Sequence, residues 1–120
     1  MILGSLQENL LTILCFDPER APIVRAVIAP ELFGGPYRLL AARIYDYLDN
    51  FKKPPGDHLP DLLSDKLEGR AAEAEYYIEI LDSLHQAKEH INPEYVMASL
   101  ETFVKRQSMR SITIDLQKAL

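Results

Sequence analysis

The chain has 120 residues and a mass of 13.7 kDa, which is the size of one domain. Its formal net charge of −5 argues against nucleic-acid backbone binding as the main task, because neutralising phosphates requires a surplus of lysine and arginine. No apolar run approaches the roughly 20 residues needed to span a bilayer, and the first residues lack the basic stretch of a signal peptide. The single cysteine, Cys15, cannot form an internal disulfide, so we expect a reducing, cytoplasmic location.

The first two elements expected are helices that Asp17-Pro18 separates. Ser5 and Glu8 have the spacing of a capping box, in which a hydroxyl caps the helix and a carboxylate follows three residues later. The expected buried face of this helix consists of Leu6, Leu10, Ile13 and Leu14. The second helix is short and has Pro22 in its first turn, where a missing N–H is tolerated. Its expected apolar side consists of Ile23, Val24, Val27 and Ile28.

A single turn and a longer helix follow. Residues 29–33 predict a tight helical turn that Gly34-Gly35 stops. Pro36 then begins the clearest helix of the chain, in which apolar residues recur every three or four positions. These apolar residues are Tyr37, Leu40, Ala41, Ile44, Tyr45, Leu48 and Phe51. The sequence KKPPGD, residues 52–57, predicts a loop because it contains two prolines and a glycine.

Three more helices are expected after this loop. Asp57 can cap a short helix that ends near Gly69. The inward residues of this helix are Leu59, Leu62, Leu63 and Leu67. A helix over residues 71–88 comes next, and its expected buried residues are Ala74, Tyr77, Ile78, Leu81 and Leu84. Asn92-Pro93-Glu94 starts the last helix with an N-cap, a proline in the first turn and a carboxylate at the positive end of the helix dipole.

These elements predict an all-α fold, because no segment alternates with period two for long enough to form a strand. We expect a small globule of about five or six helices, residues 1–91, followed by one long C-terminal helix, residues 92–120. From residue 93 onward the sequence has neither glycine nor proline, so this helix has about 28 residues and a length of about 42 Å. A compact domain of this size is about 35 Å across, which is less than the length of the helix.

The long helix carries two apolar patches on different faces. The first patch, which we expect to pack on the globule, consists of Val96, Leu100, Phe103 and Val104. The second patch begins after a polar interval and has no surface of its own globule left to cover it. We name it the terminal stripe, and it consists of Met109, Ile112, Leu116 and Leu120. The terminal stripe is the candidate interface for self-association or for a partner protein.

Chemical motifs are sparse. The sequence offers no constellation for catalysis, cofactor binding or metal binding, and we expect this chain not to be an enzyme by itself. Cys15 lies among apolar neighbours and is expected to be a buried, inert thiol. Lys105, Arg106 and Arg110 form a candidate exposed basic patch, which we interpret as the solvated side of the long helix rather than as a phosphate contact.

Several sequence blocks, taken in order, resemble one known family. QENLLTILCFDP, residues 7–18, follows the pattern Glu-Gln-x-Val-Leu-Gly-x-x-Leu and then Asp-Pro, with acid and amide exchanged and with Thr12 in place of glycine. PELFGGPYRLLAARIYDYL, residues 30–48, is similar to a Pro-Glu-x-Phe-Tyr turn followed by His-Arg, with Tyr37 in place of histidine. The matched positions in this block are Pro30, Glu31, Phe33 and Arg38. Further correspondences are Asp57, Asn92, Glu94 and the basic stretch of residues 105–110.

In order and spacing these blocks resemble, over nearly the whole chain, the N-terminal domain of the DnaB family of bacterial replicative helicases. The departures indicate a divergent, phage-like member. The resemblance implies a helical globule followed by a helical hairpin, of which the long helix is the first arm. Hairpins of neighbouring subunits pair in the hexamer, and the same domain docks primase or a loader during DNA replication. ATP and Mg²⁺ belong to a separate RecA-like motor domain of what is then an ATP-dependent DNA helicase.

Two alternatives are left open. The closest is the C-terminal helicase-binding domain of a bacterial primase, which shares the plan of a helical globule and a long helix. An all-α DNA-binding regulator with a helix-turn-helix belongs to a different class, with residues 36–51 as the candidate recognition helix. That helix is too apolar and too acidic for a major groove, so we favour the assembly and docking domain.

Overall fold

The computed structural model of the protein describes the backbone of residues 2, 5–69 and 71–119, and the side chains of these residues except 71 and 108–119. Within these residues every element of regular secondary structure is a helix, and this confirms the predicted all-α class. The elements in chain order are α1 (Ser5–Phe16), α2 (Ala21–Val27), the 3-10 helix η1 (Pro30–Leu32), α3 (Pro36–Phe51), the 3-10 helix η2 (Gly56–Leu63), α4 (Ser64–Leu67), α5 (Ala71–Ala87) and α6 (Pro93–Ala119).

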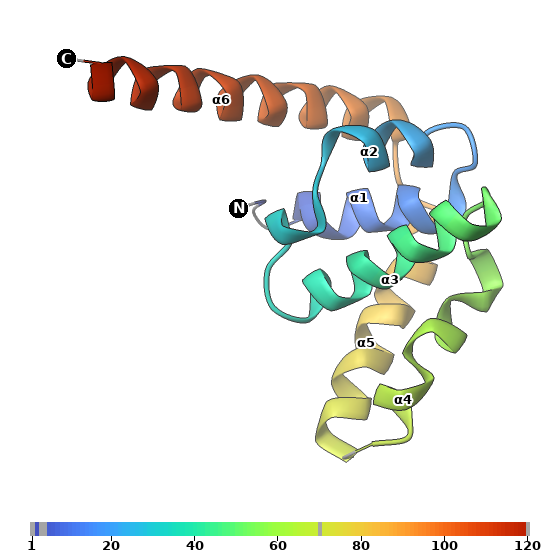
Figure 1. The fold of residues 1–120 in the computed structure, drawn as a ribbon. Helices are drawn as coiled ribbons and strands as arrows, with labels where there is room; N and C mark the ends of the chain where they lie inside the picture. Colours follow the sequence, from blue (N-terminus) through green and yellow to red (C-terminus); the bar gives the residue numbers. More distant parts are fainter. Residues whose placement is uncertain (1, 3–4, 70, 120) are drawn as a thin grey trace.

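Helix α1 lies at the centre of the globule, and α2, α3, α5, α6 and η2 all pack against it (Figure 1). Residues 10–15 are six consecutive buried positions, so α1 is covered on every side rather than on one face. A helix that is apolar all round belongs in a core, because an amphipathic surface helix would show a polar face. The single stripe predicted from Leu6, Leu10, Ile13 and Leu14 therefore described only part of its burial, and Leu6 itself is only partly buried.

The polar atoms buried with α1 have partners. The Thr12 hydroxyl donates a hydrogen bond of 2.7 Å to the carbonyl oxygen of Glu8, one turn earlier in the same helix. Cys15 is fully buried, as predicted, and the loss of solvation raises the pKa of its thiol. The thiol is therefore held in its neutral form and serves as a small apolar packing group.

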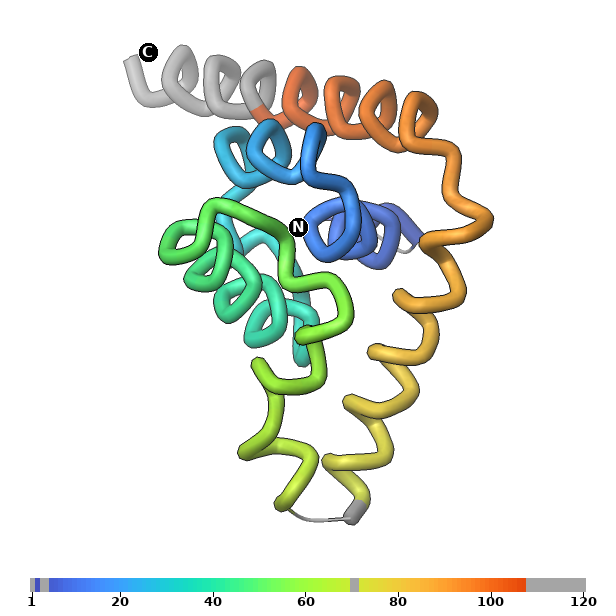
Figure 2. Tube along the Cα trace, turned by 90° about the vertical axis from the view of Figure 1, so that its right-hand side faces the viewer, coloured from blue at the N-terminus to red at the C-terminus, as the bar shows by residue number. Residues whose placement is uncertain are grey.

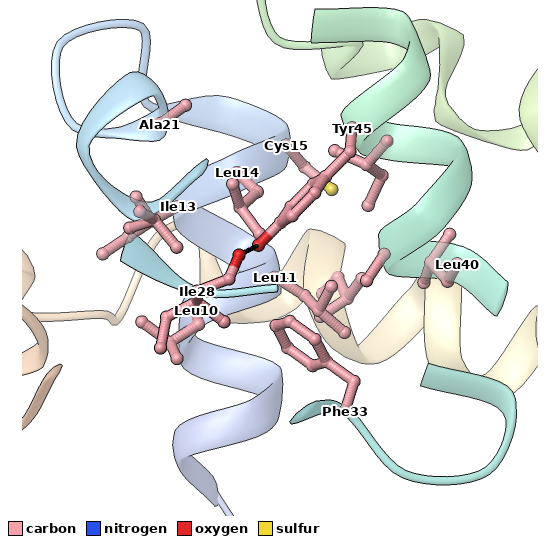
Figure 3. Packing of buried hydrophobic residues seen from close by; sticks show 14 of the residues in the cluster. Leu10, Leu11, Ile13, Leu14, Cys15, Ala21, Ile28, Phe33, Leu40 and Tyr45 are labelled. Carbon is pink, nitrogen blue, oxygen red and sulfur yellow. Dashed lines mark hydrogen bonds between the residues drawn. The ribbon is translucent and has the colours of Figure 1, made fainter. Parts of the chain in front are cut away.

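A buried tyrosine fixes α3 against the segment that follows α2. The Tyr45 hydroxyl donates a hydrogen bond of 2.7 Å to the carbonyl oxygen of Ile28, inside the apolar cluster (Figure 3). The Arg25 guanidinium lies 4.5 Å from the centre of the Tyr45 ring and pairs with Asp49 through Nη2 and Oδ2 at 3.0 Å. Burial raises the pKa of Tyr45, so its hydroxyl keeps the proton that it donates.

Two further hydrogen bonds join α1 to the turn before α3 and to the first turn of α3. The Gln7 side-chain oxygen accepts a bond of 2.8 Å from the backbone N–H of Gly34, and the Tyr37 hydroxyl donates one of 2.9 Å to Glu8. Burial and this carboxylate raise the pKa of Tyr37 to about 12. The predicted capping box is wrong, because Ser5 is already the first helical residue and the Glu8 carboxylate points to Tyr37.

Most predicted boundaries hold, but several apolar side chains face outward. In α2 the buried residues are Ala21 and Val24, while Ile23 and Val27 are exposed, because this short helix presents only one narrow side to α1. Phe51, at the end of α3, is also exposed, and its ring packs on Tyr47 with centroids 4.6 Å apart.

The segment after the proline-rich loop begins with a 3-10 helix, whereas the sequence predicted an ordinary short helix. Pro60 lacks an N–H for an α-helical bond, and the chain forms the 3-10 helix η2 before the short α4. Asp57 does not cap this segment, because Pro55 occupies the N-cap position and no side-chain bond closes the end. Gly56 has φ of 54°, a left-handed conformation that glycine adopts without steric cost.

Helix α6 begins as predicted and packs its first apolar patch on the globule. The backbone N–H of Tyr95 donates a hydrogen bond of 3.2 Å to the Asn92 side chain, which is the expected N-cap. Val96 and Leu100 are buried against the core. Phe103 and Val104 are partly buried beside them, which confirms the first patch.

Removing the Tyr45 hydroxyl tests the core hydrogen bond. We expect Tyr45→Phe to lower the free energy of unfolding by about 1–3 kcal/mol, because the buried Ile28 carbonyl loses its donor. The control is Tyr47→Phe on the partly buried side of the same helix, which we expect to change it by less than about 0.5 kcal/mol. Urea unfolding followed by circular dichroism measures both, and equal effects would contradict this role of Tyr45.

Candidate functional site

The site residues predicted from the sequence lie at and beyond the end of the described side chains. Lys105 and Arg106 are exposed on α6, and Lys105 Nζ pairs with Glu101 Oε1 at 3.0 Å, one turn earlier. The other member of the predicted basic patch, Arg110, lies outside the described side chains. The same is true of the whole terminal stripe, namely Met109, Ile112, Leu116 and Leu120. Their roles stay predictions.

Metal ligands do not gather in the part of the chain that the structure describes: no group of three or more histidine, cysteine, aspartate or glutamate side chains there is placed to hold an ion. Among the same residues, no helix is both long enough and apolar enough to cross a membrane.

A groove with a volume of about 410 Å³ opens between α5, η2, α4 and the last residue of α1. We call it the α5 groove. Its apolar lining consists of Phe16, Leu59, Pro60, Leu67, Ile78 and Leu81. The remaining lining residues are Gly56, Asp57, Asp82 and His85. A concave, mainly apolar surface with a few polar groups is the usual form of a binding site.

The register of α5 determines which of its residues line the groove. Tyr77, Ile80 and Leu84 recur every three or four positions and are buried against the core. This register turns Ile78 and Leu81 toward the groove, and Ile78 remains 53% exposed. The prediction that Ile78 is buried is therefore wrong.

Aromatic and cationic contacts hold one end of the groove in place. The Phe16 ring meets His85 edge to face, with centroids 6.0 Å apart and planes at 74°. The Lys88 ammonium lies 5.0 Å from the centre of the same ring, within the range of a cation–π contact. Phe16 is thus fixed on two sides, which makes this end of the groove a preformed surface.

Exposed carboxylates lie beside part of the apolar lining. Asp57 and Asp82 are exposed and belong to the groove itself. Glu75 and Glu79 are exposed on α5 at three residues before and one residue after Ile78. The α5 groove therefore combines an apolar floor with exposed carboxylates at part of its edge, while Lys88 lies over Phe16 at one end.

A second hollow, with a volume of about 450 Å³, lies between α2 and the end of α3. Arg25 and Asp49 both line it and pair with each other through two hydrogen bonds of 3.3 and 3.0 Å. Because this pair already satisfies the main charges of the hollow and anchors Tyr45, we interpret it as part of the fold.

Comparison with protein-family models, with curated proteins and with solved structures gives no match for this chain. Its function is therefore inferred from its own residues and their geometry.

The α5 groove was not foreseen from the sequence, although α5 contained a signal for it. Its apolar residues include Ala74, Tyr76, Tyr77, Ile78, Ile80, Leu81 and Leu84, which are too many for one narrow stripe. A helix with more apolar residues than its core-facing side accommodates must expose some of them. Which ones are exposed depends on the position of α1, which the sequence pattern does not give.

Two isoleucines of α5, which lie two positions apart, offer a matched test of the groove. We expect Ile78→Ala to change the free energy of unfolding by less than about 0.5 kcal/mol, because this side chain is half exposed. Ile80→Ala, at a residue that is 5% exposed, should lower it by about 2–5 kcal/mol. Urea unfolding measures both, and a large loss from Ile78→Ala would make Ile78 a core residue rather than a surface for binding.

Proposed function

We propose that this chain is a non-catalytic assembly and partner-docking domain of a DnaB-like replicative DNA helicase. In this role it pairs subunits within the hexamer and binds primase or a helicase loader during DNA replication. The observation that carries the proposal is the order and spacing of the sequence blocks at residues 7–18, 30–48 and 92–110.

Contacts among the residues of these blocks support the proposal. Arg38 donates hydrogen bonds of 3.1 and 3.2 Å to the carbonyl oxygens of Phe33 and Glu31, within the second block. Gln7 of the first block accepts the N–H of Gly34 in the second, at 2.8 Å. These contacts show that the first and second blocks lie together in the fold.

The spacing of the terminal stripe supports an assembly role. Met109, Ile112 and Leu116 are three and four positions apart, and residues at this spacing share one face of a helix. In the proposed role α6 is the first arm of a hairpin, and the terminal stripe contacts a neighbouring subunit. ATP and Mg²⁺ act in a separate motor domain, so this domain needs no cofactor of its own.

Self-association through the terminal stripe is the first prediction. We expect the chain to associate reversibly and Leu116→Asp to weaken the association, since burying each such side chain contributes about 1.5–3 kcal/mol. Gln117→Asp is the matched control, because it introduces the same charge at the neighbouring position, outside the stripe. Sedimentation equilibrium over a wide concentration range measures both. A chain that stays monomeric throughout, or equal effects of the two substitutions, would contradict the interface.

The choice of binding partner distinguishes the two hypotheses, a helicase domain and a primase domain. We expect the chain to bind a primase from the same source in calorimetric titrations and not to bind the replicative helicase of that source, apart from subunit exchange. The reverse preference would identify the chain as the helicase-binding domain of a primase. Tight binding of duplex DNA in a gel-shift titration at low salt would instead favour the DNA-binding regulator.

A further inference from the structure

We propose that the α5 groove binds an amphipathic helix of a partner protein, and that this helix carries lysine or arginine residues along one side of its apolar face. The inference goes beyond the proposed function and does not depend on it, because it uses only the residues that form the groove. It states the chemistry of the occupant and the side chains that recognise it.

The net negative charge of the chain is concentrated in the segment that forms most of the groove. Residues 56–90, which include η2, α4 and α5, carry nine acidic and three basic side chains, a net charge of −6. The other 85 residues carry nine acidic and ten basic side chains, a net charge of +1. A surface with this charge attracts cationic partners and repels nucleic acids and anionic membranes. The occupant is therefore cationic.

Along the second half of α5, the groove lining and the exposed carboxylates form two parallel stripes. The first stripe lines the groove at positions i, i+3 and i+7 and consists of Ile78, Leu81 and His85. The second, which we call the acidic stripe, is exposed at positions i, i+4 and i+7 and consists of Glu75, Glu79 and Asp82. Residues at these spacings share one face of a helix. The groove side of α5 is thus about two turns long and has carboxylates along one edge.

Basic side chains of the fold pair with other carboxylates. Arg43 Nη2 lies 3.0 Å from Asp65 Oδ2, and Lys66 Nζ lies 3.1 Å from Glu73 Oε1. Asp57 lines the groove from η2 and is exposed. Among the described residues, neither Asp57 nor the acidic stripe forms an ion pair, so these carboxylates are free to meet the basic residues of a partner.

The Phe16 end of the groove differs in charge from the rest. Lys88 lies 5.0 Å from the centre of the Phe16 ring, and His85 packs against the same ring. A lysine of the partner at this end is repelled by Lys88, whereas one beside the acidic stripe is attracted. The basic residues of the occupant therefore lie beside the acidic stripe.

The open form of the groove suits a helix better than a small molecule. Ile78 is 53% exposed although it lines the groove, and His85 is also exposed, so the groove covers its occupant from one side. Sites for small molecules bury about 70–90% of the ligand surface. A helix laid in an apolar groove instead inserts residues at i, i+3 or i+4 and i+7 and keeps its polar side in water.

The groove lies apart from the surface proposed for self-association. In both views α6 crosses one end of the molecule, whereas α4 lies at the opposite end (Figures 1 and 2). The lining residues of the groove belong to α1, η2, α4 and α5. A partner can therefore occupy the groove while the terminal stripe contacts a second copy.

Three synthetic peptides of about 18 residues, long enough to form a helix, serve as probes. The basic probe has leucine at every third or fourth position and lysine along one side of this leucine face. The acidic probe has glutamate in place of lysine, and the scrambled probe has the composition of the basic probe without its leucine face. Fluorescence anisotropy of each labelled probe, titrated with the full 120-residue chain, gives the dissociation constants. We expect the basic probe to bind about tenfold or more tighter than the other two.

Two isoleucines with almost equal exposure test the apolar part of the contact. Ile78 lines the groove and is 53% exposed, whereas Ile23 lies on α2 and is 51% exposed. We expect Ile78→Ala to raise the dissociation constant of the basic probe about fivefold, and Ile23→Ala to leave it unchanged.

Charge reversal tests the acidic part. The groove variant is Asp57→Arg/Asp82→Arg, and the control is Glu19→Arg/Asp46→Arg, which makes the same charge change at exposed positions outside the groove. We expect the groove variant to raise the dissociation constant of the basic probe about tenfold or more and to bind the acidic probe more tightly than the unaltered chain does. The control should change either constant by less than about threefold. Circular dichroism first shows that the variants are folded.

Several outcomes overturn the inference. Equal effects of the groove variant and the control mean that net charge alone attracts the probe, and equal binding of the basic and scrambled probes means that no helix face is recognised. Absence of binding at about 1 mM basic probe also excludes the site. If the groove variant instead weakens self-association in sedimentation equilibrium, the occupant is a second copy. A groove variant that fails to fold leaves the decision to Ile78→Ala and Ile23→Ala. None of these results alters the test of the assembly role by Leu116→Asp.

Discussion

The burial of residues 10–15 of α1 on every side is the constraint on which the rest of this fold depends. Residues 10–15 have no solvent-facing side, so the chain needs a neighbouring element in every direction around this helix. α2, α3, α5, α6 and η2 provide these neighbours, and each contributes the stripe that faces α1. The polar side chain within this stretch, Thr12, is tolerated because its hydroxyl bonds to the carbonyl of Glu8.

The enclosure of residues 10–15 also determines which side chains of α5 reach the surface. α5 has more apolar residues than its neighbours cover, so Ile78 is half exposed and lines the groove together with the partly buried Leu81. The packing of α5 places exposed carboxylates beside the apolar lining of the groove.

Helix order and most boundaries were predictable because proline, glycine and N-cap residues act locally. Pro36 and Asn92 set helix starts through their own backbone chemistry, and the structure confirms both. Predictions of burial were less accurate, as Phe51 and Ile78 show. Apolar residues three and four positions apart give a stripe up to two residues wide, and the neighbouring helix decides which edge is covered.

The sequence by itself determined the all-α class, the positions of the breaks between helices, the start of α6 and the uneven distribution of charge, since each depends on local backbone preferences or on composition. Only the tertiary structure decided which apolar side chains are buried, that Glu8 binds Tyr37 rather than a helix end, and where the groove lies. These features depend on contacts between residues far apart in the chain, and such contacts exist only after α1 has been enclosed.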